Sequence, residues 1–309
     1  MERTSGLGGR PTAGTAGTAR DRTPAGPGEA EEALLDQAAT WLGESDALLV
    51  CAGAGMGVDS GLPDFRGDTG FWRAYPPYAR LGLSFAQLAD PVHFRADPAL
   101  AWGFYGHRLG LYRRTVPHQG FEVLRRWGAR LPAGMWVFTS NVDGQFQRAG
   151  IGEVAEVHGS IHHLQCTLPC TPDVWPADGV EVAVDPDTMR ALEPLPRCPR
   201  CGALARPNIL MFGDWNWVGD RSERAVRACN SWLDGLIGAG AGGGAGRRLA
   251  VLEIGAGTAV PTVRRMAESA AGGRLIRVNP REAGIRAGAG VALGAGALAT
   301  LAELDARLR

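Results

Sequence analysis

The chain has 309 residues, of which 45% are hydrophobic and 21% charged, and its basic and acidic residues balance to a formal net charge of zero. This length can bury a sizeable core in one large α/β domain with a smaller module, and the neutral balance predicts no direct binding to nucleic acid. No apolar run approaches the roughly 18 residues of a membrane span, and no N-terminal segment resembles a secretory signal. We therefore expect no membrane contact and a cytoplasmic location.

Residues 1–28 differ in composition from the rest of the chain. They are rich in Gly, Thr, Ala, Pro and Arg and contain almost no large apolar residues. Such a segment cannot bury enough apolar surface to offset the conformational entropy lost on folding. We predict a disordered arm over 1–28, followed by one folded region over 29–309.

The pattern of apolar residues predicts an alternation of helices and strands after the arm. Helical spacing occurs over 29–42, 97–115, 118–130, 220–237, about 260–271 and about 297–308. Short apolar runs typical of buried strands occupy 47–52, 135–139, 154–157, 209–212, 249–254 and 274–278. The run GAGAGGGAG at 238–246 predicts a flexible connector. Strands that alternate with helices favour an α/β fold with a doubly wound parallel sheet.

The first strand leads directly into the run GAGMGVDSGLPDFRG at 53–67. Gly53 and Gly55 allow the backbone to approach a phosphate group closely. A generic dinucleotide fingerprint would need a third glycine at the position of Val58, so that motif is broken. The run ends in a charged and aromatic cluster, Asp64, Phe65 and Arg66. A phosphate site alone does not need this cluster, which indicates a larger ligand; the alternative is a loop stabilised by an ion pair between its two charged members.

Polar residues follow two further strands. Asn141 and Asp143 come after the strand at 135–139, and His158 comes after the strand at 154–157. Ligands of open α/β sheets bind outside the carboxyl ends of the strands. Histidine titrates near neutral pH and suits a general base. The alternatives are ordinary turn residues at 141 and 143 and a polar cap at 158.

Four of the six cysteines are clustered. Cys166 and Cys170 are separated by three residues, and Cys198 and Cys201 by two. Two such pairs fit a tetrahedral zinc site, and four thiolate ligands leave no open position, so the metal would be structural. The alternatives are redox pairs or buried free thiols. The neutral charge of the chain and the absence of a basic stripe around 166–201 argue against a nucleic-acid-binding zinc ribbon.

The ordered set of motifs resembles the sirtuins, the NAD-dependent protein deacylases. The resemblance covers about 31–309 and rests on GAGMGVDSGLPDFRG at 53–67, TSNVDG at 139–144, VHGS at 157–160, the four cysteines, RPNILMFGD at 206–214, GAGT at 255–258 and RVN at 277–279. It implies a Rossmann-like core of about 29–67, 116–160 and 205–309. It also implies a smaller zinc-binding and helical module of about 68–115 and 161–204.

The resemblance assigns most of the predicted site to NAD. The residues that it implies as cofactor-binding are Gly53, Ala54, Gly55, Asp64, Phe65, Arg66, Ser140, Asn141, Asp143, Gly255, Gly257, Thr258 and Asn279. Asn141 is also implied in catalysis, and His158 as the base that acts on a ribose hydroxyl. The chain departs from the family at Ser140, where glutamine is usual, and at Ala256 and Gly257, where hydroxyl side chains are usual.

The resemblance also implies an acylated protein or peptide as the second substrate. Phe212, Gly213 and Asp214 would receive the peptide as an added strand, although the family usually has Glu at the last position. Tyr105 and Arg108 lie three residues apart on the helix predicted over 97–115, hence on one face. They resemble the Tyr-x-x-Arg pair of sirtuins that remove acidic acyl groups such as succinyl. The alternative is a surface arginine beside a half-buried tyrosine.

Three functions remain open at this point. The first is an NAD-dependent protein-lysine deacylase that releases nicotinamide and O-acyl-ADP-ribose. The second is ADP-ribosyl transfer or NAD hydrolysis on the same scaffold, which Ser140 and the altered second glycine turn keep open. The third is an NAD or ADP-ribose sensor with little turnover. A hydride-transferring dehydrogenase is disfavoured because both glycine turns break its fingerprint.

Overall fold

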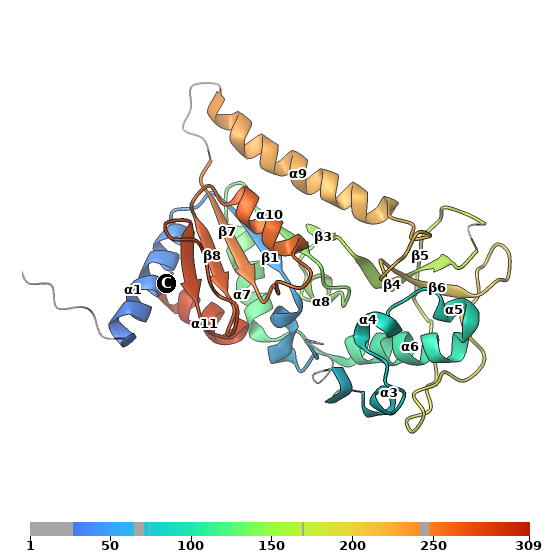
Figure 1. The fold of residues 1–309 in the computed structure, drawn as a ribbon. Coiled ribbons are helices and arrows are strands. Elements are labelled where there is room, and N and C mark those ends of the chain that lie inside the picture. Colours follow the sequence, from blue (N-terminus) through green and yellow to red (C-terminus); the bar gives the residue numbers. More distant parts are fainter. Residues whose placement is uncertain (1–26, 65–70, 74, 169, 242–246) are drawn as a thin grey trace, which may run out of the picture.

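The computed structural model describes residues 27–64, 71–73, 75–168, 170–241 and 247–309. It contains a large sheet covered by helices on both faces and a smaller part with short helices and a second sheet (Figure 1). The arm predicted over 1–28 lies outside the described residues except at its end, because helix α1 (Pro27–Gly43) begins there. None of the helices in these ranges is long and apolar enough to cross a membrane.

The large sheet has six parallel strands in the order β3-β2-β1-β7-β8-β9. Their bounds are β1 (Ala47–Ala52), β2 (Met135–Thr139), β3 (Val154–Glu156), β7 (Leu249–Ile254), β8 (Leu275–Val278) and β9 (Gly290–Leu293). The predicted doubly wound parallel sheet is confirmed. The chain builds outward from β1 on one side and then returns to build outward from β7 on the other. The crevice outside the ends of β1 and β7 is therefore the topological switch point, where such sheets bind ligands.

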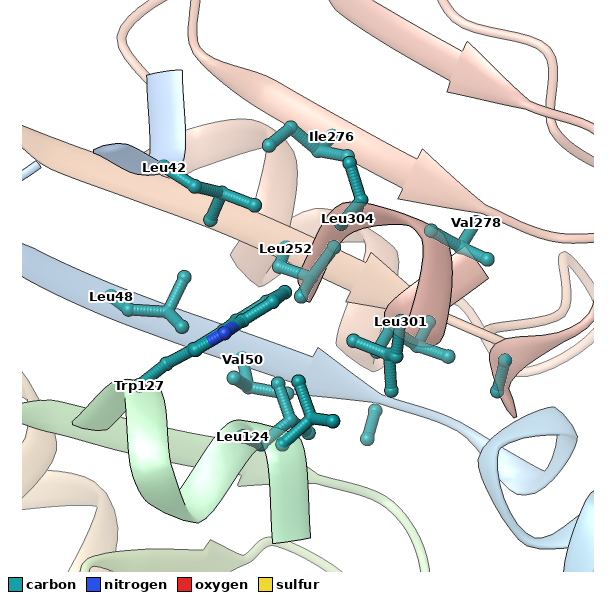
Figure 2. Packing of buried hydrophobic residues seen from close by; sticks show 14 of the residues in the cluster. Leu42, Leu48, Val50, Leu124, Trp127, Leu252, Ile276, Val278, Leu301 and Leu304 are labelled. Carbon is teal, nitrogen blue, oxygen red and sulfur yellow. The ribbon is translucent and has the colours of Figure 1, made fainter. Parts of the chain in front are cut away.

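The six residues of β1 are all buried because the strand has a core on each face. Leu48 and Val50 pack into one hydrophobic cluster and Leu49 and Cys51 into another. The first cluster is covered by α1, α7 (Gln119–Arg130) and α11 (Ala297–Arg307), the second by α9 (Asp220–Ala241) and α10 (Thr262–Ala270). Figure 2 shows Trp127 and Leu304 over the first face. The unbroken apolar run predicted at 47–52 follows from this double coverage.

Helix α7 shows how the sequence pattern sets a packing face. Phe121, Leu124 and Trp127 are buried at helical spacing, while the ion pair of Arg125 and Glu122 lies on the exposed side. The indole Nε1 of Trp127 donates to Asp305 of α11 at 3.0 Å. The amphipathic pattern thus fixes α7 against both the sheet and α11.

The smaller part contains short helices, the long helix α6 and a three-stranded antiparallel sheet of order β5-β4-β6. Its helices are α3 (Pro76–Arg80), α4 (Phe85–Leu88), α5 (His93–Ala96) and α6 (Pro98–Arg114). Two further short helices, η1 (Ala54–Ser60) after β1 and α8 (Gln145–Arg148) after β2, contribute Met56 and Phe146 to the core of the large sheet. The strands are β4 (Gly159–Cys166), β5 (Trp175–Pro176) and β6 (Ala205–Ile209). Helix α6 lies within the range predicted for the small module, and all six strands of the large sheet lie within the ranges predicted for the core.

Two predicted elements differ from the structure. The strand expected over 209–212 is wrong, because β6 pairs with β4 and ends where Ile209 meets Gly159 at the start of β4. The next residues turn away, and the amide of Leu210 donates to the carbonyl of His158 at 2.9 Å. The connector expected over 238–246 is wrong at its start, because α9 continues to Ala241, and the rest of it, 242–246, lies outside the described residues.

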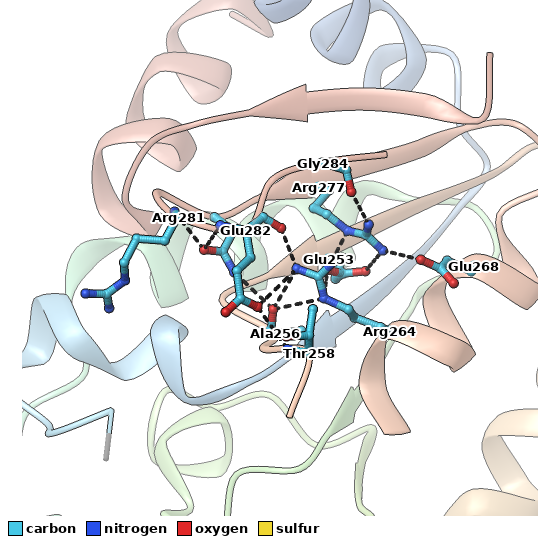
Figure 3. Close-up of polar contacts among 10 residues, drawn as sticks. Glu253, Ala256, Thr258, Arg264, Glu268, Arg277, Arg281, Glu282 and Gly284 are labelled. Carbon is cyan, nitrogen blue, oxygen red and sulfur yellow. Dashed lines mark hydrogen bonds and ion pairs between the residues drawn. The ribbon is translucent and has the colours of Figure 1, made fainter. Parts of the chain in front are cut away.

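A buried ion pair joins β7 to β8 beside the switch point. Arg277 donates from Nε and Nη2 to the two carboxylate oxygens of Glu253, each at 2.7 Å, and both side chains are almost fully buried (Figure 3). Nη1 of Arg277 donates to the carbonyl of Gly284 at 2.7 Å. Burial raises the pKa of Glu253. The pair thus ties the loop after β8 to the strand that carries the second glycine turn.

Candidate functional site

A cavity of about 620 Å³ opens where the ends of β1 and β7 meet the smaller part of the molecule. Its wall combines both glycine turns, the loops after β2 and β3, helix α6 and the segment after β6. The predicted site residues on this wall are Gly53, Ala54, Asp64, Tyr105, Arg108, Ser140, Asn141, Asp143, His158, Phe212, Gly255, Gly257 and Thr258. The topology therefore gathers residues from six separate segments into one site.

The other predicted residues lie elsewhere. Gly55 and Asn279 line a pocket of about 60 Å³ that shares Asp64 and Gly255 with the large cavity. Phe65 and Arg66 lie outside the described residues. The four cysteines and the pair Gly213 and Asp214 do not line either pocket.

The two glycine turns are in direct backbone contact. A Cβ atom added at Gly53 would lie 2.7 Å from Cα of Ala256, and one added at Gly55 would lie 2.6 Å from Cα of Gly255. Gly255 has a φ of +62°, which favours glycine, and its carbonyl accepts the amide of Gly55 at 3.1 Å. The glycines thus let the turns approach each other, in addition to exposing backbone to the cavity.

Asn141 connects the loop after β2 to the first glycine turn. Its Nδ2 donates to the carbonyl of Gly53 at 2.9 Å, and its backbone amide donates to Oγ1 of Thr139 at 3.0 Å. Thr139 in turn donates to the carbonyl of Ala52 at 2.8 Å. Asn141 and the neighbouring Ser140 are therefore held at the cavity wall by contacts to the end of β1.

Asp143 is a buried carboxyl group at the cavity wall. Its Oδ1 accepts the amide of Gln145 at 2.9 Å, and Nε2 of His162 lies 2.9 Å from its backbone carbonyl. Burial raises the pKa of Asp143 to about 6, and the charge of Glu156 adds to the rise. The carboxyl group of Asp143 therefore titrates within the pH range in which enzymes are commonly assayed.

His158 brings an imidazole to the cavity between β3 and β4. The backbone around it is fixed, because Val157 donates to the carbonyl of Thr139 at 2.9 Å and Gly159 begins β4. Gly159 has a φ of +80°, and a Cβ there would lie 2.0 Å from the carbonyl oxygen of Asn208. Burial lowers the pKa of His158 below its usual value of 6.5. Its imidazole is therefore neutral at pH 7 and able to accept a proton.

Tyr105 and Arg108 project from α6 into the same cavity and are both buried, so Arg108 is not a surface residue. The Tyr105 hydroxyl has no hydrogen-bond partner among the residues that the structure describes. Burial raises its pKa to about 12, so it stays protonated and able to donate. Arg108 donates from Nε and Nη2 to the hydroxyl of Tyr112 at 3.0 and 2.8 Å. A cationic group and a hydroxyl donor thus lie together on the cavity wall.

The segment after β6 contributes Phe212 but not the carboxylate beside it. Phe212 is partly exposed at the cavity wall, and its amide donates to the carbonyl of Ala89 at 2.9 Å. The side chain of Asp214 is fully buried in an ion pair with Arg206 of β6. It also accepts the amide of Asn216 at 3.2 Å. Its carboxylate therefore holds this turn together and points away from the cavity.

The second glycine turn is contacted by an acidic side chain, Glu282, that sequence reasoning missed. Oε2 of Glu282 accepts the amide of Thr258 at 2.9 Å and lies 3.7 Å from Nη2 of Arg264 (Figure 3). Asn279 is buried, and its Nδ2 donates to the carbonyl of Ala256 at 2.9 Å. Glu282 lines the cavity. The loop after β8 brings Glu282 to the cavity, and no local sequence motif predicts this position.

The four predicted cysteines form one cluster at the end of β4. Their sulfur atoms lie within 4.8 Å of one another, with Cys166 and Cys201 3.6 Å apart and Cys170 and Cys198 3.7 Å apart. Zinc–sulfur bonds of about 2.3 Å in a tetrahedron place the sulfurs about 3.8 Å apart. The donor set and its spacing therefore fit a zinc ion with four thiolate ligands.

Tyr112 is the other functional candidate that sequence reasoning missed. It lies on α6 four residues after Arg108 and lines the cavity. The spacing of Tyr112 from Arg108 could have indicated it from the sequence, since residues four apart on a helix share a face.

Comparisons with known proteins identify the family of this chain. The Sir2 family pattern matches residues 53–243. NAD-dependent protein deacylase 1 of Archaeoglobus fulgidus is 32% identical over 244 residues, which cover 78% of this chain and 84% of that protein. NAD-dependent protein deacylase 1 of Pseudomonas aeruginosa is 34% identical over 63% of this chain and 73% of its own length.

A solved structure with the same fold carries the cofactor that the motifs imply. The crystal structure of a Sir2 homologue in complex with NAD superposes with a TM-score of 0.61 at 26% identity, over 90% of this chain and 93% of that chain. The extent of the family match, the deacylase relative at 84% coverage and the shared fold lead to one conclusion: this chain belongs to the Sir2 family of enzymes.

Proposed function

We propose that this chain is an NAD-dependent protein-lysine deacylase that prefers acyl groups ending in a carboxylate. The observation that carries the proposal is one cavity whose wall combines the two glycine turns, His158 and the pair Tyr105 and Arg108. The names of the relatives support the reaction, and the buried cation supports the acyl preference.

The cavity suits NAD. The backbone of the two glycine turns would face the phosphates, and Asn141 and Asp143 would hold the nicotinamide end. Asn279, beside the small second pocket, would hold the adenosine end. When bound, NAD supplies the bond between nicotinamide and ribose that breaks, and a ribose that accepts the acyl group.

His158 would act as the general base. The reaction needs a group that removes a proton from a ribose hydroxyl, and a neutral imidazole does this without losing a proton first. Burial already keeps His158 neutral, because desolvation disfavours the charged imidazolium and lowers the pKa. Asp143 lines the same cavity, and burial raises the pKa of its carboxyl group to about 6.

We expect the pH profile of kcat/KM to reflect this assignment. Because the base must be unprotonated, activity should rise with pH through a pKa below 6.5 and stay flat at neutral pH. The rising limb should persist in the residual activity of Asp143→Asn, whose own carboxyl has a pKa of about 6. A limb centred above pH 6.5, or its loss in Asp143→Asn, would contradict His158 as the base.

The acyl preference rests on Arg108 and Tyr105. An arginine offers paired donors that match a carboxylate, and the Tyr105 hydroxyl can donate a further hydrogen bond. The rings of Phe104 and Tyr105 lie 5.0 and 5.7 Å from Cζ of Arg108, so little water can screen the charge. The acylated peptide would lie outside, along Phe212 and Gly213, and its modified lysine would reach inward.

We expect succinyl-lysine to be a better substrate than acetyl-lysine by about ten- to hundredfold in kcat/KM, since a hydrogen bond to a charged group contributes about 1.5–3 kcal/mol. Arg108→Met should depress desuccinylation much more than deacetylation. The measurement is the ratio of the two kcat/KM values, with the products identified by mass spectrometry. An unchanged ratio in Arg108→Met would refute the role of Arg108.

The reaction products also distinguish deacylation from ADP-ribosyl transfer and NAD hydrolysis. Ser140, with a shorter side chain than the usual glutamine, lines the cavity and keeps ADP-ribosyl transfer or NAD hydrolysis as the second candidate. O-acyl-ADP-ribose together with free lysine supports deacylation. ADP-ribosylated peptide, or ADP-ribose alone, supports the second candidate.

The cysteine cluster would hold a structural zinc ion. All four ligands are protein thiolates, so the metal has no open position for substrate. The zinc ion would join the end of β4 to the segment that leads into β6. The residues proposed to contact the peptide follow directly after β6.

We expect about one zinc ion per chain by elemental analysis. Because metal binding is coupled to folding, Cys198→Ala should release zinc and lower the midpoint of thermal unfolding, whereas Cys229→Ala, which removes a buried thiol outside the cluster, should keep the metal. Metal-free wild-type protein, or full zinc content in Cys198→Ala, would show that the cluster is not a zinc site.

A further inference from the structure

Tyrosine is confined to one place in this protein. The chain has four tyrosines, and all of them lie within 75–112 and are buried. The hydroxyl of Tyr78 donates to the carbonyl of Met189 at 3.0 Å, and that of Tyr75 contacts His107 at 3.2 Å. Tyr105 and Tyr112 instead line the cavity together with Arg108.

Tyr112 holds one edge of the Arg108 guanidinium. Its hydroxyl oxygen accepts from Nε at 3.0 Å and from Nη2 at 2.8 Å, so two donors of the planar group converge on one atom. Tyr112 is itself fixed, because it is buried in α6 and its backbone carbonyl accepts Nε2 of Gln145 at 3.1 Å. The guanidinium is therefore restrained in rotation as well as in position.

The chemistry of the restraint matters as much as its geometry. Burial raises the pKa of the Tyr112 hydroxyl, so it is a neutral phenol at working pH. A carboxylate at this position would also fix the guanidinium, but it would cancel the positive charge and repel an acidic acyl group. A phenol orients the cation without placing a negative charge beside it.

We propose that Tyr112 is a positioning residue that sets the selectivity for acyl groups ending in a carboxylate, by orienting Arg108 without neutralising it. The inference rests on the acyl preference proposed above. A flexible arginine loses rotational freedom when it binds a carboxylate, and a pre-oriented one loses less. Tyr112 thus lowers the cost of holding the acidic acyl group and has no comparable effect on an acetyl group.

The test compares kcat/KM for succinyl-lysine and acetyl-lysine peptides in wild type, Tyr112→Phe and Tyr78→Phe. Phenylalanine keeps the ring and removes the hydroxyl. The succinyl-to-acetyl ratio should fall about tenfold in Tyr112→Phe, as expected for loss of a charge-assisted hydrogen bond. It should not change in Tyr78→Phe, which loses a buried hydroxyl bond to the carbonyl of Met189 and none to Arg108. The ratio cancels the fraction of folded enzyme, so a loss of stability alone does not move it.

A double-variant cycle separates positioning from direct contact. In an Arg108→Met background, Tyr112→Phe should leave the ratio unchanged, because Tyr112 acts only through Arg108. A further fall in that background would mean that Tyr112 contacts the acyl group itself. A ratio that stays constant or rises in Tyr112→Phe alone would also overturn the proposal.

The same measurements distinguish a failure of the proposed acyl preference from a failure of the proposed role of Tyr112. If wild type does not prefer succinyl-lysine, the proposed preference is wrong and the role of Tyr112 falls with it. If wild type prefers succinyl-lysine and Tyr112→Phe retains the full preference, only the role of Tyr112 is wrong.

Discussion

The contact between the two glycine turns is the constraint on which the rest of the site depends. Parallel strands β1 and β7 are neighbours, so their carboxyl ends meet, and each strand continues into a turn. A Cβ atom at Gly255 would lie 2.4 Å from Cα of Gly55, a distance at which backbone would have to move. Glycine at these positions therefore sets the separation of the turns. Asn141 and Asn279 then bind the turns from either side, through the carbonyls of Gly53 and Ala256.

Both parts of the molecule contribute residues to the cavity, and they contribute different kinds of group. The large sheet supplies backbone at the glycine turns and the polar loops with Asn141 and Asp143, while α6 supplies Arg108 and the rings around it. Burial acts in opposite directions on the ionisable groups here: it lowers the pKa of His158 and raises that of Asp143. Enclosure thus favours a neutral imidazole at His158, while the always-charged guanidinium of Arg108 remains a cation on the cavity wall.

The core strands and long helices were predictable because their periodicity is local and strong. The run at 47–52 is apolar throughout because β1 has a core on each face, and Phe121, Leu124 and Trp127 follow the helical period of α7. The pairing of β4 with β6 was not predictable, since its register depends on contacts between segments far apart in the chain. For the same reason the motif around Asp214 placed this residue in a peptide-receiving segment but did not indicate its ion pair with Arg206. The predicted residues at 65 and 66 lie outside the described residues.

The measurement that tests the central claim most directly is the affinity of NAD for Gly55→Ala, by isothermal titration calorimetry, against Gly152→Ala as the control. The added methyl group at Gly55 would lie 2.6 Å from Cα of Gly255, whereas a Cβ at Gly152 meets nothing within 4 Å. Overpacking of this kind costs about 1–3 kcal/mol, so we expect NAD affinity to fall about tenfold or more in Gly55→Ala and to stay at the wild-type value in Gly152→Ala. Wild-type affinity in a folded Gly55→Ala protein would contradict the claim that contact between the two turns builds the NAD site.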